Sequence, residues 1–206
     1  VVVLTMGPAQ AVETLKEAIG IGADEAVLLS DPAFEGSDTW ATSYILSKAV
    51  RKIGQFDLVL CGKQSIDGET GQVGPQLAEA LGLPFVSMVN KIEELGQGCI
   101  KVMRMSEEGH QLIEMTLPGV INVVKEINVP RLPSLRGMMA AKKAKIPVWN
   151  AKELGVDPAS VGASGSPTRV AKVFFPQRAG RSEMLQGTPE SQVDQLVEKL
   201  RQTRAI

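Results

Sequence analysis

Three short apolar runs, each followed by a turn and a helical pattern, constrain the fold of this chain more than any other feature. The runs are Val1 to Thr5, Ala26 to Leu29 and Asp57 to Cys61. Apolar, β-branched runs without polar alternation are typical of parallel strands that are covered on both faces. Strands that alternate with helices predict an α/β fold, with a parallel sheet, helices on both faces and right-handed crossovers. We expect Val1 to Thr5 to be an inner strand.

Helical patterns fill the segments after these runs. Pro8 opens the first pattern, which continues until the stretch GIGAD stops it. Asp38 can cap a second helix that runs towards Ile53. A third pattern covers Gly71 to Leu81 and ends at the stretch GLP. These patterns complete the predicted α/β layer.

The pattern changes after this layer, from Phe85 to Val124. Longer alternating runs predict antiparallel strands there, with the sequences FVSMVNKIEEL, CIKVMRM and HQLIEMTLPGVINVV. Gly96, Gln97 and Gly98 join the first two runs as a hairpin turn. A proline-punctuated loop then leads into a short basic helix.

The remaining residues resemble an extended tail. Residues 151–190 are rich in Gly, Pro and Ser, with one predicted strand at Arg169 to Phe175. A final helix then places an apolar stripe on one face, made of Val193, Leu196, Val197 and Leu200. We therefore predict an α/β domain at residues 1–150 and a carboxyl-terminal arm at residues 151–206 that packs on another subunit.

Composition narrows the possible partners and compartments. The 22 basic and 23 acidic residues leave a net charge of -1, so no global positive field favours nucleic acid. Cys61 and Cys99 form neither a CxxC motif nor a Cys/His cluster, which favours free thiols in a reducing cytoplasm over disulfides or a zinc site. No apolar run approaches the roughly 18 residues of a membrane span, and no signal peptide is visible. Because Val1 already lies in a strand pattern, we expect further sequence before it.

A glycine-rich turn, GKQSIDGETGQVGP at residues 62–75, follows the third apolar run. Ligands of open α/β sheets bind beyond the carboxyl ends of the strands, which is where this turn lies. Its glycines allow the backbone to approach a ligand closely. The amides of Gly71, Gln72 and Val73, at the start of the next helix, are placed to face a phosphate, and Thr70 adds a hydroxyl.

Charged residues limit what this turn can be. Asp67 and Glu69 repel phosphate and suit ribose hydroxyls, adenine amino hydrogens or loop amides instead. The turn matches neither GxxxxGK[ST] nor GxGxxG, and Lys63 lies on the wrong side of the glycines for a phosphate-loop lysine. A plain polar turn in which Asp67 or Thr70 caps the helix explains the same residues. From the residues alone, a ligand site and a capping turn both stay open.

Three blocks of sequence resemble one family. VLCGKQSIDGETGQVGPQLAEALGLP is similar to the nucleotide-binding signature of the β subunit of electron transfer flavoproteins, and TMGPAQAVETLKEAIGIGADEAVLLSD and VPRLPSLRGMMAAKKAKI match two further blocks in the same order. The likeness runs from Val1 to the last helix. It implies a fold related to adenine-nucleotide hydrolases and stress proteins, and a pairing with an α subunit that carries FAD. Members normally begin with another strand and helix.

The resemblance also implies a cofactor. DGETGQVGP is similar to the electron-bifurcating group, in which the β subunit holds FAD, whereas another group holds AMP as a structural ligand. Asp38, Thr39 and Thr42 match positions that approach the flavin ring, although a capped helix start with solvated threonines explains them without the family. FAD is therefore the implied cofactor and AMP the alternative. The remaining implied cofactor-binding residues are Met6, Gly7, Gly62, Lys63, Gln64, Ser65, Ile66, Asp67, Gly68, Glu69, Thr70, Gly71, Gln72 and Val73.

The implied function is that of an electron carrier without catalytic side chains. Electrons would pass from NADH to ferredoxin or flavodoxin and, through the α subunit, to an acyl-CoA dehydrogenase-type partner. In the family, the loop before the basic helix projects towards the dehydrogenase, which implies Leu132 as an apolar anchor and Arg131 and Arg136 as steering charges. An ATP pyrophosphatase or ligase would need an SGGxDS-like loop, and a stress-protein-like ATP module a GxxGx loop ending in Gly-Ser; neither motif occurs in this sequence.

Overall fold

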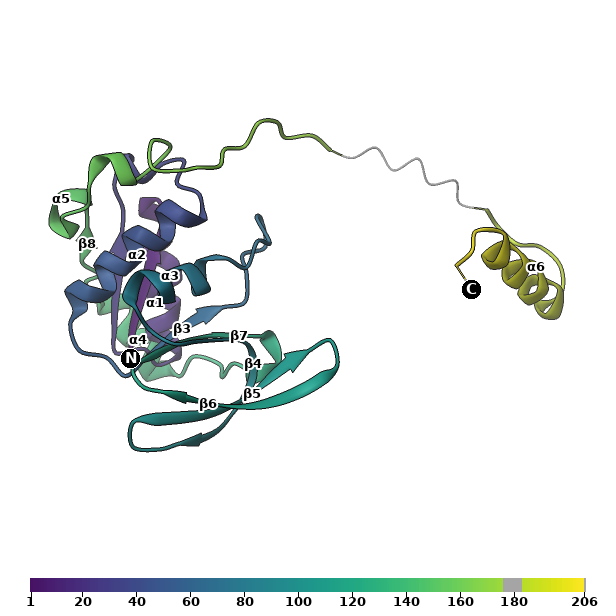
Figure 1. The fold of residues 1–206 in the computed structure, drawn as a ribbon, viewed down its shortest axis with the longest axis horizontal. Helices are drawn as coiled ribbons and strands as arrows, with labels where there is room; N and C mark the ends of the chain where they lie inside the picture. Colours follow the sequence, from purple (N-terminus) through teal and green to yellow (C-terminus); the bar gives the residue numbers. More distant parts are fainter. Residues whose placement is uncertain (176–182, 206) are drawn as a thin grey trace. The chain divides into compact units, whose positions relative to one another are not determined.

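The computed structural model describes residues 1–175 and 183–205. The chain divides into a first compact unit, Val1–Arg169, and a second unit from Val170 onward. The strands of the first unit are β1 Val2–Met6, β2 Glu25–Leu29, β3 Leu58–Gly62, β4 Phe85–Leu95, β5 Cys99–Ser106, β6 Gly109–Thr116, β7 Gly119–Val123 and β8 Val148–Trp149 (Figure 1). Its α-helices are α1 Val12–Ile21, α2 Thr39–Ile53, α3 Val73–Leu81, α4 Leu135–Lys143 and α5 Ala151–Leu154. Short 3-10 turns lie at Ala9–Ala11, Pro32–Phe34, Lys125–Ile127 and Pro158–Ser160.

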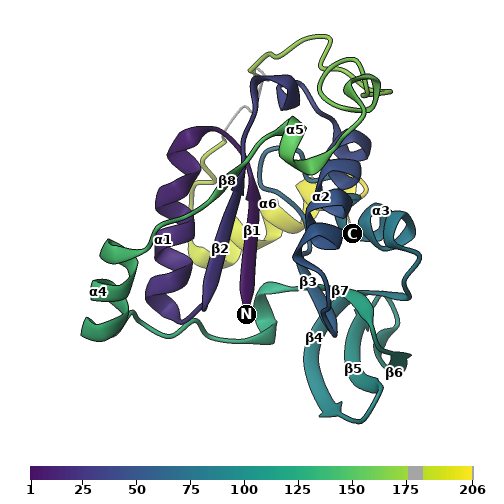
Figure 2. The same ribbon diagram turned by 90° about the vertical axis from the view of Figure 1, so that its left-hand side faces the viewer.

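Strand β2 explains why an unbroken apolar run is needed. Ala26 and Leu28 pack with Leu15 of α1 in one buried cluster. Val27 and Leu29 pack with Ile45 of α2 in another. Because successive strand residues point to opposite faces, each face of β2 belongs to a different core. Figure 2 shows α1 and α2 on opposite sides of β1 and β2.

The predicted parallel sheet with helices on both faces is confirmed. One sheet has the order β1-β2-β8, with parallel pairs throughout, and β3, β7 and β4 pair in parallel within a second sheet of order β3-β7-β4-β5-β6. The expectation that β1 is an inner strand is wrong, because among the described strands it pairs with β2 alone. A continuous apolar run indicates that both faces of a strand are covered. It does not indicate whether the strand pairs with a neighbouring strand on one edge or on both.

The predicted antiparallel strands are confirmed in part. β5 pairs antiparallel with β4 and with β6. The third run, however, is two strands, because Pro118 has no amide for a strand ladder and breaks it. β7, after this proline, pairs in parallel with both β3 and β4, and its residues Val120 and Ile121 are fully buried.

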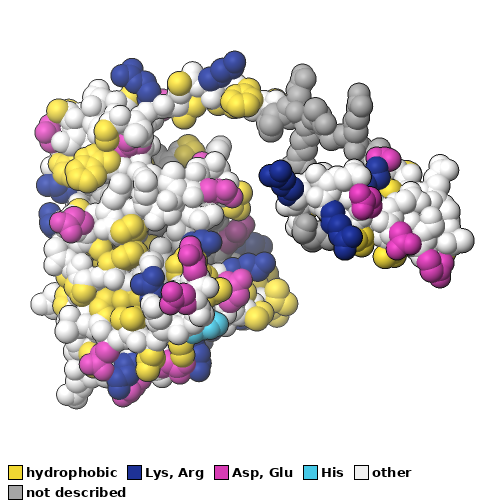
Figure 3. Space-filling model, turned by 45° about the vertical axis from the view of Figure 1, so that its right-hand side comes forward, with side chains coloured by type: hydrophobic (Ala, Val, Ile, Leu, Met, Phe, Trp, Pro, Cys, Tyr) yellow, Lys and Arg dark blue, Asp and Glu magenta, His cyan; other side chains and the backbone are white. Residues whose placement is uncertain are grey.

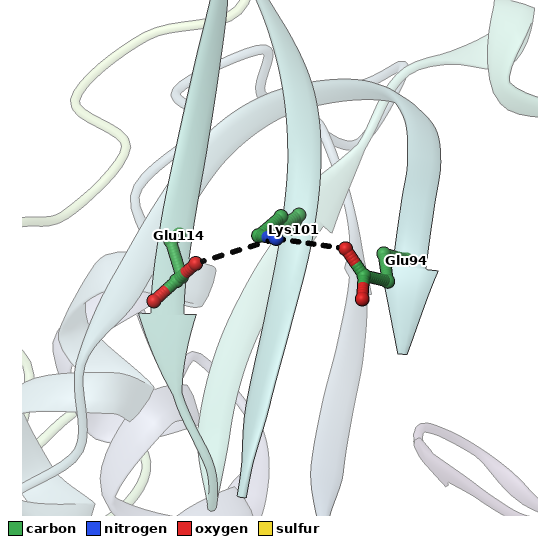
Figure 4. A network of polar contacts seen from close by, with 3 residues as sticks. All are labelled: Glu94, Lys101 and Glu114. Carbon is green, nitrogen blue, oxygen red and sulfur yellow. Dashed lines mark hydrogen bonds and ion pairs between the residues drawn. The ribbon is translucent and has the colours of Figure 1, made fainter. Parts of the chain in front are cut away.

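An ion-pair ladder crosses the antiparallel strands. Lys101 of β5 is paired with Glu114 of β6 and with Glu94 of β4, and its Nζ lies 2.8 Å from Glu94 Oε2 and 3.7 Å from Glu114 Oε2 (Figure 4). The hydrogen bond with Lys101 lowers the pKa of Glu94, and the same bond raises the pKa of Lys101. Opposite charges that face each other across strands favour this register over a shifted one.

The first unit extends further along the chain than the sequence predicted. The sequence predicts a boundary at residue 150, whereas Leu154, Val156 and Val161 are buried in the core cluster shared with β2 and α2, and the unit ends at Arg169. Three apolar side chains within a stretch rich in Gly and Ser are enough to fasten it to the core. The amino-acid composition of the whole stretch does not reveal these three buried residues, because it is rich in Gly, Pro and Ser.

The second unit contains the predicted last helix, α6 Pro189–Gln202, whose first turn is capped by Thr188. Val193 and Leu196 on its apolar stripe are 58% and 48% exposed. The strand predicted at Arg169 to Phe175 is wrong: these residues are exposed and form no strand, since strand residues need a neighbouring strand to pair with. None of the helices in residues 1–175 and 183–205 is long and apolar enough to cross a membrane.

Helices α1 and α4 touch backbone to backbone. A Cβ atom on Gly137 would overlap the carbonyl oxygen of Gly20, so only glycine fits at this position of α4. A Cβ on Gly20, by contrast, would meet Ala141 Cβ at 3.8 Å and Pro133 Cβ at 3.9 Å, which are ordinary contacts. The α1–α4 contact therefore tolerates a methyl group on one side only.

Gly137→Ala and Gly20→Ala should change the free energy of unfolding in opposite directions. At Gly137 the methyl group overlaps backbone and forces α1 and α4 apart, so the overpacking cost lies towards the upper part of about 1–3 kcal/mol and exceeds the helix-propensity gain of about 1 kcal/mol. At Gly20 only the propensity gain remains. Urea unfolding of both variants measures the difference, and a Gly137→Ala variant as stable as Gly20→Ala would contradict the close approach.

Candidate functional site

The candidate site lies where β1, β2 and β3 end and where α2 and α3 begin. Thr39, the first residue of α2, donates a hydrogen bond from Oγ1 to Gln72 Oε1, 2.9 Å away, just before α3. The buried Ser43 Oγ lies 2.7 Å from Thr39 O and 3.2 Å from Gln76 Oε1, within α3. The structure therefore brings together the start of α2 and the glycine-rich turn, two segments that the sequence analysis selected separately.

The amino terminus of α2 is closed by its own cap. As predicted, Asp38 is the cap: its Oδ1 accepts from Trp40 N at 3.0 Å and from Ala41 N at 3.1 Å. Its Oδ2 accepts from the amide and the hydroxyl of Thr168, at 2.9 and 2.8 Å. Burial acts to raise the pKa of Asp38, but the hydrogen bonds from Ala41, Thr168 and Trp40 together lower it. Both carboxylate oxygens are thus engaged within the chain, and the approach of Asp38 to a flavin ring stays a prediction.

The amino terminus of α3 is open. Gln72 is its N-cap residue and makes no side-chain cap hydrogen bond. The first amides of a helix have no partner inside the helix, so those of Gln72 and Val73 are left free at the positive end of the helix dipole. The carbonyl of Gln72 accepts from Gln76 N at 3.1 Å. Of the two helix starts at this site, α3 is the one with donors to offer an anion.

The turn before α3 is exposed and held in an unusual backbone conformation. Every residue from Gly62 to Thr70 is exposed, and Ile66 at its tip is 97% exposed. Glu69 has φ 51° and Gly71 has φ 63°, a region that favours glycine. A Cβ on Gly62 would have no neighbour within 4 Å. Open space beside Gly62 and outward amides after Gly71 leave room for a ligand against the backbone.

The acidic residues of the turn bind the turn itself. Asp67 Oδ1 accepts from Gly68 N at 2.8 Å. The Ser65 hydroxyl and the Gly68 amide hold the pKa of Asp67 below its usual value. Of the partners expected for this carboxylate, loop amides are those present. Neither Asp67 nor Thr70 caps α3, so the capping-turn interpretation is wrong.

Three other predicted cofactor-binding residues, Met6, Gly7 and Thr42, lie at the end of β1 and on α2. Met6, at the end of β1, packs against the core cluster of β2 and α2. Gly7 N donates to Leu29 O at 3.0 Å and extends the pairing of β1 with β2. Thr42 is half-buried on α2 and donates its amide to Asp38 O at 2.9 Å. Within residues 1–175, no hydrogen bond joins Met6 or Gly7 to the glycine-rich turn.

Exposed apolar side chains border the two segments. Trp40 on the first turn of α2 and Ile66 at the tip of the turn are both exposed. Figure 3 shows that such apolar side chains interrupt the charged surface of the first unit at several places.

In the part of the chain that the structure describes, no group of His, Cys, Asp or Glu side chains is placed to hold a metal ion.

The predicted partner-binding residues differ in whether their side chains make contacts within the chain. Leu132 is 90% exposed, in the loop before α4, and Arg136 is exposed on α4. Arg131, however, donates from Nε to Ile21 O at 2.6 Å, so it holds the loop to the end of α1. Its positive charge there also suits the negative end of the α1 dipole. Arg131 is thus an anchor of this loop as well as a surface charge.

Sequence reasoning missed three residues near these sites. Leu135, the first residue of α4, is 79% exposed and adds an apolar side chain beside Leu132. Ser166 and Thr168 bond to Asp38 across more than a hundred residues of chain. Leu135 could have been predicted because it is a second leucine close to Leu132 in the sequence. No local sequence pattern distinguishes Ser166 or Thr168.

Comparison with known proteins places this chain in a family. A family model described as "Electron transfer flavoprotein domain" matches residues 1–154. The "Caffeyl-CoA reductase-Etf complex subunit CarD" of Acetobacterium woodii is 45% identical, over 100% of this chain and 79% of that protein. The "Electron transfer flavoprotein subunit beta" of Thermoanaerobacterium thermosaccharolyticum is 44% identical over the same shares of the two chains, 100% and 79%. "Protein FixA" of Azorhizobium caulinodans is 42% identical, over 97% of this chain and 74% of that protein. The domain match and these relatives show that the chain belongs to the electron transfer flavoprotein family, as a subunit of the β type.

Proposed function

We propose that this chain is the β subunit of a heterodimeric electron transfer flavoprotein and that it binds FAD at the start of α3. The observation that carries the proposal is the open amino terminus of α3, which follows the carboxyl end of the parallel strand β3. Free amides and a helix dipole at this place form an anion site of the kind that binds nucleotide phosphates. The neighbouring α2 is closed by Asp38 and offers no such donors.

The residues of the turn suit a nucleotide. Gly62 leaves the backbone uncovered, and Gly71 has φ 63°, a conformation that favours glycine at the entry to α3. Asp67 is turned towards Gly68 N, so its carboxylate is held by the loop's own donors. Thr70 and Gln72 can then hydrogen-bond to phosphate or ribose oxygens. In this proposal the chain binds and orients the nucleotide and supplies no general acid or base.

Bound FAD would supply the hydride and single-electron chemistry, and the protein would supply position and electrostatics. Electrons would pass between NADH, ferredoxin or flavodoxin, and an acyl-CoA dehydrogenase-type partner, with an α subunit carrying a second FAD. The relative CarD is named as a subunit of a caffeyl-CoA reductase complex, which supports a CoA-ester reductase or dehydrogenase as the partner. The free thiols of Cys61 and Cys99 support a reducing, cytoplasmic location.

AMP is a second candidate ligand. The free amides of Gln72 and Val73 at the start of α3 suit a single phosphate group, and AMP carries one. The two ligands share the adenosine monophosphate half, so the same placement serves both. The measurement of bound nucleotide separates them.

Nucleotide released from the purified complex tests this function. Denaturation of the full chain with its α subunit should release two FAD per heterodimer, whereas one FAD and one AMP would indicate the second candidate. Gly71→Val should abolish retention by this chain, because a β-branched residue at φ 63° distorts the start of α3.

Gly82→Val is the matched control for that variant. Gly82 has φ 72° at the other end of α3 and open space around its Cβ position, so valine imposes similar backbone strain far from the turn. It should keep nucleotide at the wild-type level. Full occupancy in Gly71→Val, or equal loss in both variants, would remove the support for this placement.

Leu132 is proposed as an apolar anchor for the partner dehydrogenase. Because its side chain is 90% exposed, Leu132→Ala should leave the melting temperature and the nucleotide content unchanged. It should slow electron exchange with the cognate dehydrogenase several-fold, with Leu135→Ala acting in the same direction. Leu95→Ala, at another exposed leucine in β4, is the control and should leave exchange unchanged. Normal exchange in both loop variants would show that this loop is not the docking surface.

A further inference from the structure

Residues 161–168 form a strap across the start of α2. Ser166 Oγ accepts from Asp38 N at 2.8 Å and lies 2.7 Å from Gly162 O. Thr168 donates its amide and its hydroxyl to Asp38 Oδ2. Gly162 N donates to Ser37 Oγ at 3.0 Å. Four hydrogen bonds at least thus hold a segment remote in sequence to two consecutive residues before α2.

The strap is also packed closely against this region. A Cβ on Gly162 would overlap the carbonyl oxygen of Ala33, and Gly162 has φ 61°. Ala163 N donates to Glu35 O at 3.1 Å. Val161 is buried in the core cluster at the base of the strap. The strap is therefore a fixed part of the first unit rather than the start of a free tail.

Asp38 uses its two oxygens for two different tasks. Oδ1 caps the amides of α2, and Oδ2 bonds to Thr168. The cap does not require Thr168, because Oδ1 is sufficient to bond Trp40 N and Ala41 N. The bond to Thr168 instead fixes the orientation of the carboxylate and of the chain that leads into Thr39.

Thr39, the residue after Asp38, connects the start of α2 to the candidate site. Its hydroxyl bonds to Gln72 Oε1, and Gln72 is the residue whose amide opens α3. A continuous series of contacts therefore runs from Thr168 through Asp38 and Thr39 to Gln72. Any shift of the α2 start changes the position of Gln72 relative to the phosphate site.

We propose that Thr168, supported by Ser166, is a positioning residue for the nucleotide site: through Asp38 and Thr39 it sets the place of Gln72 and of the open amides of α3. This inference rests on the proposed function, since it assigns the strap to the same nucleotide site. Thr168 does not touch the nucleotide in this arrangement. Its main effect is on the affinity of the site, with only the small effect on stability of one exposed hydrogen bond.

The test uses the full chain in complex with its α subunit, after removal of bound nucleotide, with FAD and AMP as separate probes. Thr168→Val keeps the side-chain volume and the amide bond to Asp38 but removes the hydroxyl donor. It should weaken binding about tenfold, because a less constrained Asp38 no longer fixes Thr39 and Gln72. Thr168→Ser restores the hydroxyl and should bind as the wild type does. The thermal midpoint of the nucleotide-free complex should match the wild type in Thr168→Ser and fall by only about 2–4 °C in Thr168→Val, as expected for loss of one exposed hydrogen bond.

Ser160→Ala is the matched control, because its hydroxyl belongs to the same region and donates to Asp157 instead of Asp38. It should leave affinity unchanged. Equal affinity in Thr168→Val and the wild type, or a lowered thermal midpoint that accounts for the loss, overturns the inference while the proposed function stands. A wild-type complex that binds neither FAD nor AMP overturns the proposed function and the inference with it. If Thr168→Val does not fold, Ser166→Ala decides: wild-type affinity in that variant overturns the inference.

Discussion

Backbone amides at the start of a helix need an acceptor, and the way this chain meets that need organises the whole site. Two helices, α2 and α3, begin beside one another and are joined by the hydrogen bond between Thr39 and Gln72. Asp38 satisfies the amides of α2 from within the chain, whereas no side chain caps α3. The proposed position of an anionic ligand follows from this asymmetry. So does the proposed role of the strap at residues 161–168, which is bonded to the start of the closed helix.

The folding pattern that creates this asymmetry could be predicted because it depends on local sequence. The alternation of Ala26 and Leu28 with Val27 and Leu29 requires a helix on each face of β2, and Asp38 is a standard cap at the right distance from the apolar positions of α2. The glycine-rich turn was found because glycine permits backbone conformations such as that of Gly71. These features need no knowledge of the rest of the chain.

The features that sequence did not predict depend on contacts between distant residues. The parallel pairing of β7 arises from a break at Pro118 and from the neighbouring strands β3 and β4, none of which is visible in the alternation of the run itself. Val161, Ser166 and Thr168 lie in a stretch that reads as an extended tail, yet they pack and bond to residues near Asp38. Arg131 reads as a surface charge, and only its bond to Ile21 O shows that it fastens the loop before α4. Family membership supplies the electron-transfer context, and the residues through which this chain would take part in it stay a proposal.

The central claim is that a nucleotide phosphate binds the open amides of α3. The most direct measurement is the change in backbone amide chemical shifts of the 15N-labelled chain, in its complex, when AMP or FAD is added. The amides of Gly71, Gln72 and Val73 should show the largest changes, and those of Trp40 and Ala41 should change little because Asp38 already occupies them. Largest changes at Trp40 and Ala41, with the start of α3 unaffected, would contradict the account.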